Sequence, residues 1–294
     1  MQNSLTEKHH RSLVLKSRIS SGAGKTFAYT WLVVLCLTTI FPFFWMLSTS
    51  LKPKTEIIFH RLLPQQPTIA NYIDVLTRWQ YGTWFFNSVI VTVVTVVSTL
   101  LFCSLCGYAL AKYNFPGRNL FFILILATIM VPGEMLLIPW FVSAFKIKIV
   151  NSLPGLVFPG LMGAFGVFVM RQAFLNIPNE MLDAARVDGV SELGIFFRIV
   201  LPLTGSAMAA LGVLTALGTW NDYFWPLIIM QTVDRYTLQL GMMHASVTDA
   251  TRELITNWSV VMTSTSIASL PMLVLVVILQ KYFVKGIALS GLKR

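Results

Sequence analysis

The sequence predicts an all-α membrane protein with six transmembrane helices. Of its 294 residues, 55% are hydrophobic and only 12% are charged, and the mean hydropathy is +0.71; soluble domains carry about twice that share of charge. Five long stretches contain no Asp, Glu, Lys or Arg, and a sixth contains only Glu134. Each exceeds the roughly 20 residues that a helix needs to cross the hydrocarbon layer. Helices are expected because they satisfy their own backbone hydrogen bonds in lipid.

These six stretches define the expected spans. They are placed near Phe27–Leu47, Phe85–Leu110, Asn119–Phe141, Leu153–Ala173, Ile199–Gly218 and Val260–Phe283. The first span could instead belong to a cleaved signal sequence, since a basic segment precedes it. The 25-residue leader is long for such a sequence, and no small-x-small cleavage pattern follows Ser48, so an uncleaved anchor is favoured.

The distribution of basic residues predicts that both termini are cytoplasmic (N-in/C-in). Six crossings put the termini on one side, and that side holds 14 of the 22 Lys and Arg residues, against 8 on the other. Residues 1–25 are therefore expected to form a cytoplasmic tail, and residues 26–294 the six-span transmembrane domain. The net charge of +10 fits this topology and attraction to anionic lipid better than it fits nucleic-acid binding.

Several kinds of site are disfavoured by where the reactive side chains fall. The three cysteines lie inside the expected spans, which argues against a disulfide framework, and the four histidines lie outside them. No intramembrane metal or haem ligand set is therefore available, and no serine lies in a nucleophile-elbow pattern. We expect no bound metal and no enzymatic activity in this chain.

Residues 177–198 are the best-patterned segment outside the spans, and they predict a helix, a glycine break and a second short helix leading into the fifth span. Pro178 suits a first helical turn, and Glu180 lies where a carboxylate favours the positive helix end. Gly189 allows a backbone conformation that a side chain would resist, and Ser191 can cap the next helix. The first helix has an apolar face formed by Met181, Leu182 and Ala185.

This segment has the properties of a docking element. It is short, amphipathic and exposed on an otherwise membrane-bound chain, and the small side chains of Ala184 and Ala185 let its first helix approach a partner closely. A solvated helix lying between spans at the membrane surface has the same pattern, and the pattern alone does not separate the two interpretations.

The spacing of residues in this segment matches a known signature. Asp183-Ala184-Ala185 is followed after three positions by Gly189, and about a dozen residues later by Pro202. It resembles the Glu-Ala-Ala signature of the membrane permease subunits of binding-protein-dependent ATP-binding cassette (ABC) importers. In that family the signature forms the coupling helix, which lies in a cleft of the ATPase subunit. Asp183 departs from it, because it keeps the charge of Glu but is one methylene shorter.

Further short matches occur in order along the chain. They resemble the sugar and glycerol-phosphate branch of that family, specifically the second permease subunit of maltose-transporter type. The matches are Phe41 to Phe44 with Ser48 to Lys52, Asn87-Ser88, Tyr108-Ala109, Met130 to Pro132 with Ile138-Pro139, and Trp220 to Pro226.

The resemblance implies a type I ABC importer permease fold in the bacterial or archaeal cytoplasmic (inner) membrane. It also implies a second permease subunit forming a heterodimer, two ATPase subunits that bind ATP and Mg, and an extracytoplasmic solute-binding protein that delivers a sugar. This chain would itself bind no cofactor. We call residues 177–198 the coupling segment; the residues implied in contact with the ATPase are Glu180, Asp183, Ala184, Ala185, Asp188, Gly189 and Pro202.

Two other groups of residues are candidates for contacts with substrate or binding protein. A charge inside the membrane costs on the order of 3 kcal/mol, so acids in or beside spans are expected to face the pathway or a partner; structural hydrogen bonding between helices is the alternative. The pathway candidates are Glu134, Asn221, Asp222 and Tyr223. The binding-protein candidates, in an outer loop of residues 230–257, are Asp234, Arg235, His244 and Asp249.

Other function classes compete with this interpretation. A secondary transporter or channel of six spans, not powered by ATP, generally places ion-coupling acids at the midplane and often shows internal repeats. Here acids are sparse, and the best-patterned segment lies outside the spans. A membrane-embedded scaffold is a third class, for which deletion would abolish no transport.

Overall fold

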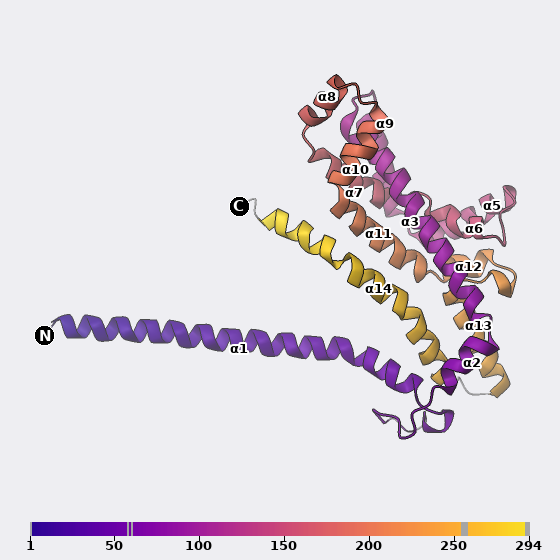
Figure 1. Cartoon of the computed structure of the whole chain (residues 1–294), viewed down its shortest axis with the longest axis horizontal. Helices are drawn as coiled ribbons and strands as arrows, with labels where there is room; N and C mark the ends of the chain where they lie inside the picture. Colours follow the sequence, from indigo (N-terminus) through magenta and orange to yellow (C-terminus); the bar gives the residue numbers. More distant parts are fainter. Residues whose placement is uncertain (1, 58, 60, 254–257, 292–294) are drawn as a thin grey trace.

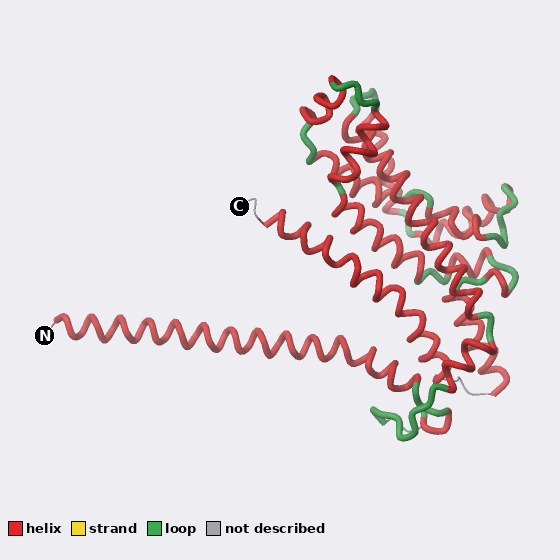
Figure 2. Tube along the Cα trace, viewed as in Figure 1, coloured by secondary structure: helices red, strands yellow, loops and turns green. Residues whose placement is uncertain are grey.

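The structure is a computed structural model that describes the backbone of residues 2–57, 59, 61–253 and 258–291. Side chains are described for residues 24–57, 59, 61–246, 258–278 and 280. All regular elements in these residues are helical, which confirms the predicted all-α class (Figure 2).

The helices follow one another with short connections. The α-helices are α1 Gln2–Ser50, α2 Ala70–Arg78, α3 Tyr81–Lys112, α4 Arg118–Ala127, α5 Leu137–Lys146, α6 Leu153–Val157, α7 Ala164–Leu175, α8 Asn179–Val187, α9 Glu192–Ile195, α10 Leu201–Leu203, α11 Gly205–Trp220, α12 Phe224–Ile229, α13 Leu238–Glu253 and α14 Trp258–Gly291. The 3-10 helices are η1 Lys54–Glu56, η2 Thr128–Met130, η3 Gly133–Leu136, η4 Phe158–Gly160 and η6 Val233–Arg235, and η5 Phe196–Val200 is a π-helix.

Three helical segments are long and apolar enough to cross a membrane unbroken. They are Gly24–Ser50 within α1, Tyr81–Lys112 and Trp258–Ile278 within α14. Each of the other three expected spans is a pair of helices with a sharp bend. The bends are 98° between Arg118–Met130 and Gly133–Lys146, 52° between Leu153–Gly160 and Ala164–Leu175, and 80° between Glu192–Leu203 and Gly205–Trp220. The described residues therefore give six spans when each bent pair counts as one.

The third, fourth and fifth expected spans are thus broken helices, and the local backbone explains why. Pro132 lacks an N–H to continue a helix and has φ −57° and ψ 134°. Gly163 is extended, with φ −124° and ψ 141°. Thr204, two residues after Pro202, departs from helical geometry at φ −100° and ψ 18°. Of these breaks, the one at Pro132 is indicated by the sequence.

The N-terminal residues continue the first span as a helix. The backbone of α1 is helical from Gln2, so residues 2–25 and the first span form one helix; the side chains of residues 1–23 lie outside the described residues. In Figure 1, α1 lies apart from the bundle along most of its length, and the C-terminal end of α1 meets α14. Most of its large apolar side chains between Phe27 and Leu47 are exposed in the isolated chain, as suits contact with lipid or another subunit.

The long helix α3 forms the centre of the bundle (Figure 1), with α7 and α11 packed along it. Glycines permit the close crossing of α3 and α7: a Cβ on Gly107 would lie 2.9 Å from the backbone nitrogen of Arg171, and one on Gly166 would lie 2.7 Å from Sγ of Cys103. One end of α3 lies near α8 and α9, and the other near α2 and α13. The segment expected on the cytoplasmic side of the membrane and the loop expected on the outer side therefore lie at opposite ends of the bundle.

Buried apolar side chains form a cluster at the α8 end and two clusters farther along the bundle. The cluster at the α8 end joins α3, α7, α8 and α9 and includes Tyr108, Phe174, Leu182, Ile195 and Phe196. The other two are built around Trp84 with Trp220 and around Trp225 with Ile229. The first cluster connects the coupling segment to the spans through tightly packed side chains.

Candidate functional sites

The coupling segment folds as two short helices joined by a tight turn, as its sequence predicts. Gly189 follows α8 with φ +77°. Its N–H donates to the carbonyl of Arg186, and the next N–H donates to the carbonyl of Ala185, both at 3.0 Å. A left-handed glycine in this position satisfies the last carbonyl groups of a helix. The Ser191 hydroxyl accepts the N–H of Gly194 at 3.2 Å and so caps α9.

One face of α8 is buried against the bundle. Leu182 and Ala185 are 1% and 7% exposed and lie in the cluster with Phe174 and Phe196. Met181 was expected on this face but is 43% exposed. Residues three apart share a helix face, whereas adjacent residues point about 100° apart, so α8 cannot bury Met181 fully beside Leu182.

A polar network ties α8 to α9 and to the end of α3. The Arg186 guanidinium lies 2.6 Å from Oδ1 of Asp183 and donates from Nε to Oε1 of Glu192 at 2.7 Å. The hydroxyl of Tyr113 donates to the other oxygen of Glu192 at 2.5 Å. Hydrogen bonds to Glu192 and then Asp183 raise the pKa of Arg186 above its usual value. Hydrogen bonds from Arg186 and then Tyr113 lower the pKa of Glu192.

Lys112, the last residue of α3, fastens the start of the coupling segment. Its ammonium donates to the carbonyl of Ile177 at 2.5 Å and to Oδ1 of Asn179 at 2.9 Å. The end of α3 therefore holds the segment at two points, through Lys112 and through Tyr113. The sequence does not indicate this role for Lys112, which there is only one of the basic residues that predict the topology.

Most of the residues implied in ATPase contact are exposed, on the outward face of α8 or in the turn that follows it. Those exposed are Glu180, Asp183, Ala184, Asp188 and Gly189. Val187, next to them, is 88% exposed. Ala185 faces inward instead, and Pro202 lies in α10 at the bend before α11, away from α8 in the sequence.

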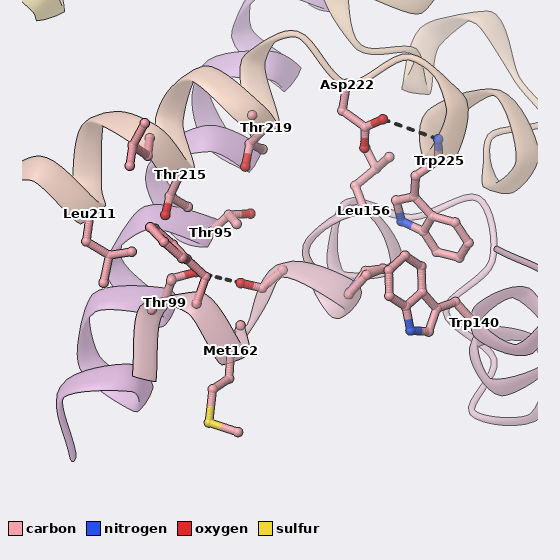
Figure 3. Close-up of a pocket in the computed structure, with 17 residues that line it drawn as sticks. Thr95, Thr99, Trp140, Leu156, Met162, Leu211, Thr215, Thr219, Asp222 and Trp225 are labelled. Carbon is pink, nitrogen blue, oxygen red and sulfur yellow. Dashed lines mark hydrogen bonds between the residues drawn. The ribbon is translucent and has the colours of Figure 1, made fainter. Parts of the chain in front are cut away.

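A cavity of about 390 Å³ lies beside α3 and α11, near the bend of the fourth span (Figure 3). The rest of its wall comes from the short helices α5, α6 and α12, from η4 and the bend that leads into α7, from the start of α7, and from Asp222. Much of the wall is apolar, as ligand pockets generally are. The apolar and aromatic residues named in Figure 3 are Trp140, Leu156, Met162, Leu211 and Trp225.

Four threonines supply hydroxyl groups to this cavity, Thr95 and Thr99 from α3 and Thr215 and Thr219 from α11. Each pair is four residues apart, so both members lie on one helix face. Thr99 donates to the carbonyl of Gly160 at 2.6 Å. Thr95 is 3% exposed, and its hydroxyl has no hydrogen-bond partner among the described residues. A buried hydroxyl without a partner is costly, and a hydrogen bond to a bound water or ligand would remove that cost.

Asp222 and two tryptophans border another part of the cavity (Figure 3). Oδ1 of Asp222 accepts the backbone N–H of Trp225 at 3.4 Å. The Trp225 ring is fixed because its Nε1 donates to the carbonyl of Gly155 at 3.0 Å, and its centroid lies 6.0 Å from that of Trp140 in an edge-on contact. Hydroxyl groups, a carboxylate and aromatic rings together suit a ligand with many hydroxyls and apolar C–H faces.

The four pathway candidates do not lie together. Asp222 lines the cavity, whereas Asn221 is exposed and donates to the carbonyl of Leu217 at 2.9 Å. Tyr223 borders a different groove, between α13 and α14. Glu134 is exposed in η3 and is not among the cavity-lining residues. The four threonines are not among the candidates that the sequence predicted. The signal that could have identified them is their spacing of four residues within charge-free stretches.

The outer loop is held to the start of α3 by Asn87 and Ser88, one of the short family matches. The Asn87 amide donates to the carbonyls of Asp234 and Tyr236 at 3.0 and 2.9 Å. The buried Ser88 hydroxyl accepts the N–H of Leu238 at 2.8 Å. The match therefore has a structural role, which fixes residues 234–238.

Most of the outer loop is helical, because α13 occupies Leu238–Glu253. Asp234 and Arg235 are exposed and lie 3.5 Å apart, and the His244 ring packs against Tyr236 with centroids 5.5 Å apart. Asp249 falls in α13, where its side chain lies outside the described residues. No group of three His, Cys, Asp or Glu side chains in the described part of the chain could hold a metal ion.

Proteins with similar sequences and structures are transporter permeases. The chain is 36% identical over 268 residues to the arabinooligosaccharides transport system permease protein AraQ of Halalkalibacterium halodurans, covering 88% of this chain and 93% of that protein. It is 31% identical over 271 residues to the sn-glycerol-3-phosphate transport system permease protein UgpE of Pectobacterium atrosepticum, covering 89% and 95%.

A solved structure has the same fold. A chain from the crystal structure of a bacterial ABC transporter involved in the import of the acidic polysaccharide alginate matches with a TM-score of 0.80 and 26% sequence identity, covering 90% of this chain and 98% of that chain. Residues 103–289 match the model of the family described as binding-protein-dependent transport system inner membrane component. The chain therefore belongs to this family, the inner-membrane permease subunits of ABC importers.

Proposed function

We propose that this permease translocates a sugar. The chemistry of the cavity supports the proposal, since threonine hydroxyls, the Asp222 carboxylate and two tryptophan rings border one space. Relatives named for arabino-oligosaccharides and for glycerol phosphate, and a structural relative from an importer of an acidic polysaccharide, support a carbohydrate or polyol substrate. These relatives differ in substrate charge, so they leave that property open.

The importer would contain a second permease subunit, two ATPase subunits and an extracytoplasmic binding protein. We place the α8 end of the bundle and both termini in the cytoplasm, with residues 1–25 as the tail and residues 230–257 outside, because most basic residues fall on the α8 side. ATP and Mg would be bound by the ATPase subunits. This chain would bind no cofactor and catalyse no reaction.

The coupling segment would transmit the movement of the ATPase. Its outward face, with Asp183 and Ala184, would lie in an ATPase cleft, while Leu182 and Ala185 press on the bundle. Packed cores deform little, so a displaced α8 would carry α3 and α7 with it. ATP and the loaded binding protein must both favour the outward-open state, because only differential affinity couples two sites.

The exposed pair Asp234 and Arg235 would contact the binding protein. Deleting the outer loop would test this poorly, because Leu238 and Ala245 are buried and their removal would disturb the bundle. Charge reversal of Asp234 and Arg235 leaves that packing intact. We expect it to weaken stimulation of the ATPase by the binding protein while the basal ATPase rate is retained.

Energy dependence tests the proposed function against a secondary transporter or channel. Cells expressing the whole importer are depleted of ATP while the membrane potential is maintained, and sugar uptake is measured. Loss of uptake supports an ATP-driven importer. Persistent uptake at the undepleted rate would favour the transporter or channel.

A further inference from the structure

We propose that the cavity beside α3 and α11 selects uncharged, hydroxyl-rich substrates and rejects anionic ones such as phosphate esters and uronates. This inference rests on the proposed function, since it concerns the substrate class of the same permease. It adds the property that the relatives leave open, the charge of the substrate.

The first observation is the charge of the cavity wall. None of its 17 lining residues is Lys, Arg or His, and one, Asp222, is acidic. Sites that bind phosphate or carboxylate groups generally present Arg, Lys or a set of converging N–H donors. The first turn of α7 also lines this cavity with Gly163, Phe165 and Gly166, so the group that would oppose an anion is the Asp222 carboxylate, the one ionisable side chain of the wall.

The second observation is that Asp222 has no cationic partner. No Lys, Arg or His in the described part of the chain forms an ion pair with Asp222, and its Oδ1 accepts the neutral N–H of Trp225 at 3.4 Å. Like charges a few ångströms apart in a site of reduced dielectric repel strongly enough to weaken binding by about tenfold or more. A sugar hydroxyl would donate to the same carboxylate and be attracted.

The third observation is the set of hydroxyl groups. Thr95 lines the cavity, and its buried Oγ1 has no partner among the described residues, so both its donor and its acceptor capacity are unused. The Thr99 hydroxyl donates to the carbonyl of Gly160, and its oxygen can still accept a hydrogen bond. An oxygen acceptor suits a substrate hydroxyl, whereas a phosphate or carboxylate oxygen has no proton to give it.

The test uses the complete importer in nanodiscs, without binding protein, so that the binding protein's own selectivity does not enter. Equilibrium dialysis measures binding of three labelled probes: a neutral arabino-oligosaccharide, sn-glycerol 3-phosphate and an alginate oligosaccharide. We expect the neutral probe to bind at least about tenfold more tightly than either anion. Equal or tighter binding of an anion overturns the proposal, as does failure of the neutral probe to bind.

Two variants and a control locate the effect in the cavity. Asp222→Asn keeps an acceptor but removes the charge, so the ratio of neutral to anionic affinity should fall by about tenfold. Thr95→Val keeps the shape and should weaken neutral binding by about fivefold. Ser98→Ala removes a hydroxyl of α3 that bonds to the carbonyl of Thr95 and does not line the cavity, and it should change nothing. An unchanged ratio in a folded Asp222→Asn complex overturns the proposal; if that variant does not fold, the wild-type ratio and Thr95→Val decide.

The outcome is separable from that of the proposed function. ATP-dependent uptake of any of the three probes by the importer with its binding protein would support the proposed function even if the dialysis ratio were near one. In that case the inference about charge alone is wrong. Absence of ATP-dependent uptake of every probe would count against the proposed function itself.

Discussion

Gly189 is the residue of the coupling segment whose backbone most limits substitution. Its φ is +77°, and a Cβ added there would meet no atom within 4 Å, so alanine would be disfavoured by its backbone conformation alone. That conformation costs an L-residue about 1–2 kcal/mol. We expect Gly189→Ala to reduce ATP-driven uptake several-fold, measured in whole cells at matched membrane abundance.

Two companion variants separate conformation from size at this position. Asn tolerates left-handed backbone better than Ala does, so Gly189→Asn should retain more uptake. Gly82→Ala is the control, because a Cβ there also meets no atom within 4 Å but the backbone φ is not positive. If Gly189→Ala transports as well as Gly82→Ala, the turn is not required for coupling.

Glu192 gives the coupling segment a predictable response to acid. Hydrogen bonds from Arg186 and then Tyr113 lower its pKa, so the ionised form stabilises the folded segment above the usual carboxyl pKa of about 4.3. That contribution is lost as the pH falls through the lowered folded-state pKa. We expect amide-exchange protection of residues 186–195 to stay constant from pH 7 to about 5 and to fall below about pH 4. Glu192→Gln should show low protection throughout; a wild-type acid transition retained in Glu192→Gln would contradict the assignment.

Residue-level prediction from sequence worked where the cause is local. The left-handed turn at Gly189 and the cap at Ser191 depend on a few neighbouring residues, and both were predicted. The prediction that Met181 lies on the buried face of α8 was wrong, because its exposure depends on which side of α8 the bundle packs against. Asn221 and Tyr223 flank Asp222 in sequence, but successive residues point in different directions, and only Asp222 lines the cavity.

At the scale of elements, composition predicted the six spans but not their shape. A charge-free stretch of sufficient length indicates a crossing, whether or not the helix is straight. The bends of 52° and 80° lie at Gly163 and Thr204, which the composition of a charge-free stretch does not mark. The cavity beside the 52° bend therefore could not be located from sequence, although its threonines stand in a regular repeat.

The attachment of the outer loop to α3 predicts the effect of a single hydroxyl. Ser88 is 3% exposed and accepts the N–H of Leu238 at 2.8 Å. Ser88→Ala would leave that buried N–H without a partner, which costs about 1–3 kcal/mol. We expect faster amide exchange in residues 233–241 and a weaker response of the ATPase to binding protein. Thr77→Ala, an exposed hydroxyl of α2, is the control; equal exchange in the two variants would show that Ser88 does not hold the loop.

At the scale of the whole molecule, α3 connects the three candidate sites. Lys112 at its end and Tyr113 just beyond bond to the coupling segment, Thr95 and Thr99 border the cavity, and Asn87 and Ser88 hold the outer loop. A helix is stiff over this length, so displacement at one end would shift side chains at all three sites. This arrangement provides a physical route by which ATP and the binding protein could bias the same two states.

Covalent capture of the ATPase tests the central claim most directly. In the complete importer, Cys36 and Cys106 are replaced by Ser and the buried Cys103 is retained. One new cysteine at a time is then placed at the exposed positions Asp183, Ala184 and Val187 and, as a control, at Thr77 near the opposite end. After reaction with a short bifunctional thiol reagent, we predict that the α8 cysteines cross-link to the ATPase subunit, in a pattern that changes with ATP, and that Thr77→Cys does not. Failure of every α8 cysteine to capture a nucleotide-hydrolysing subunit in a transport-competent complex would contradict the account.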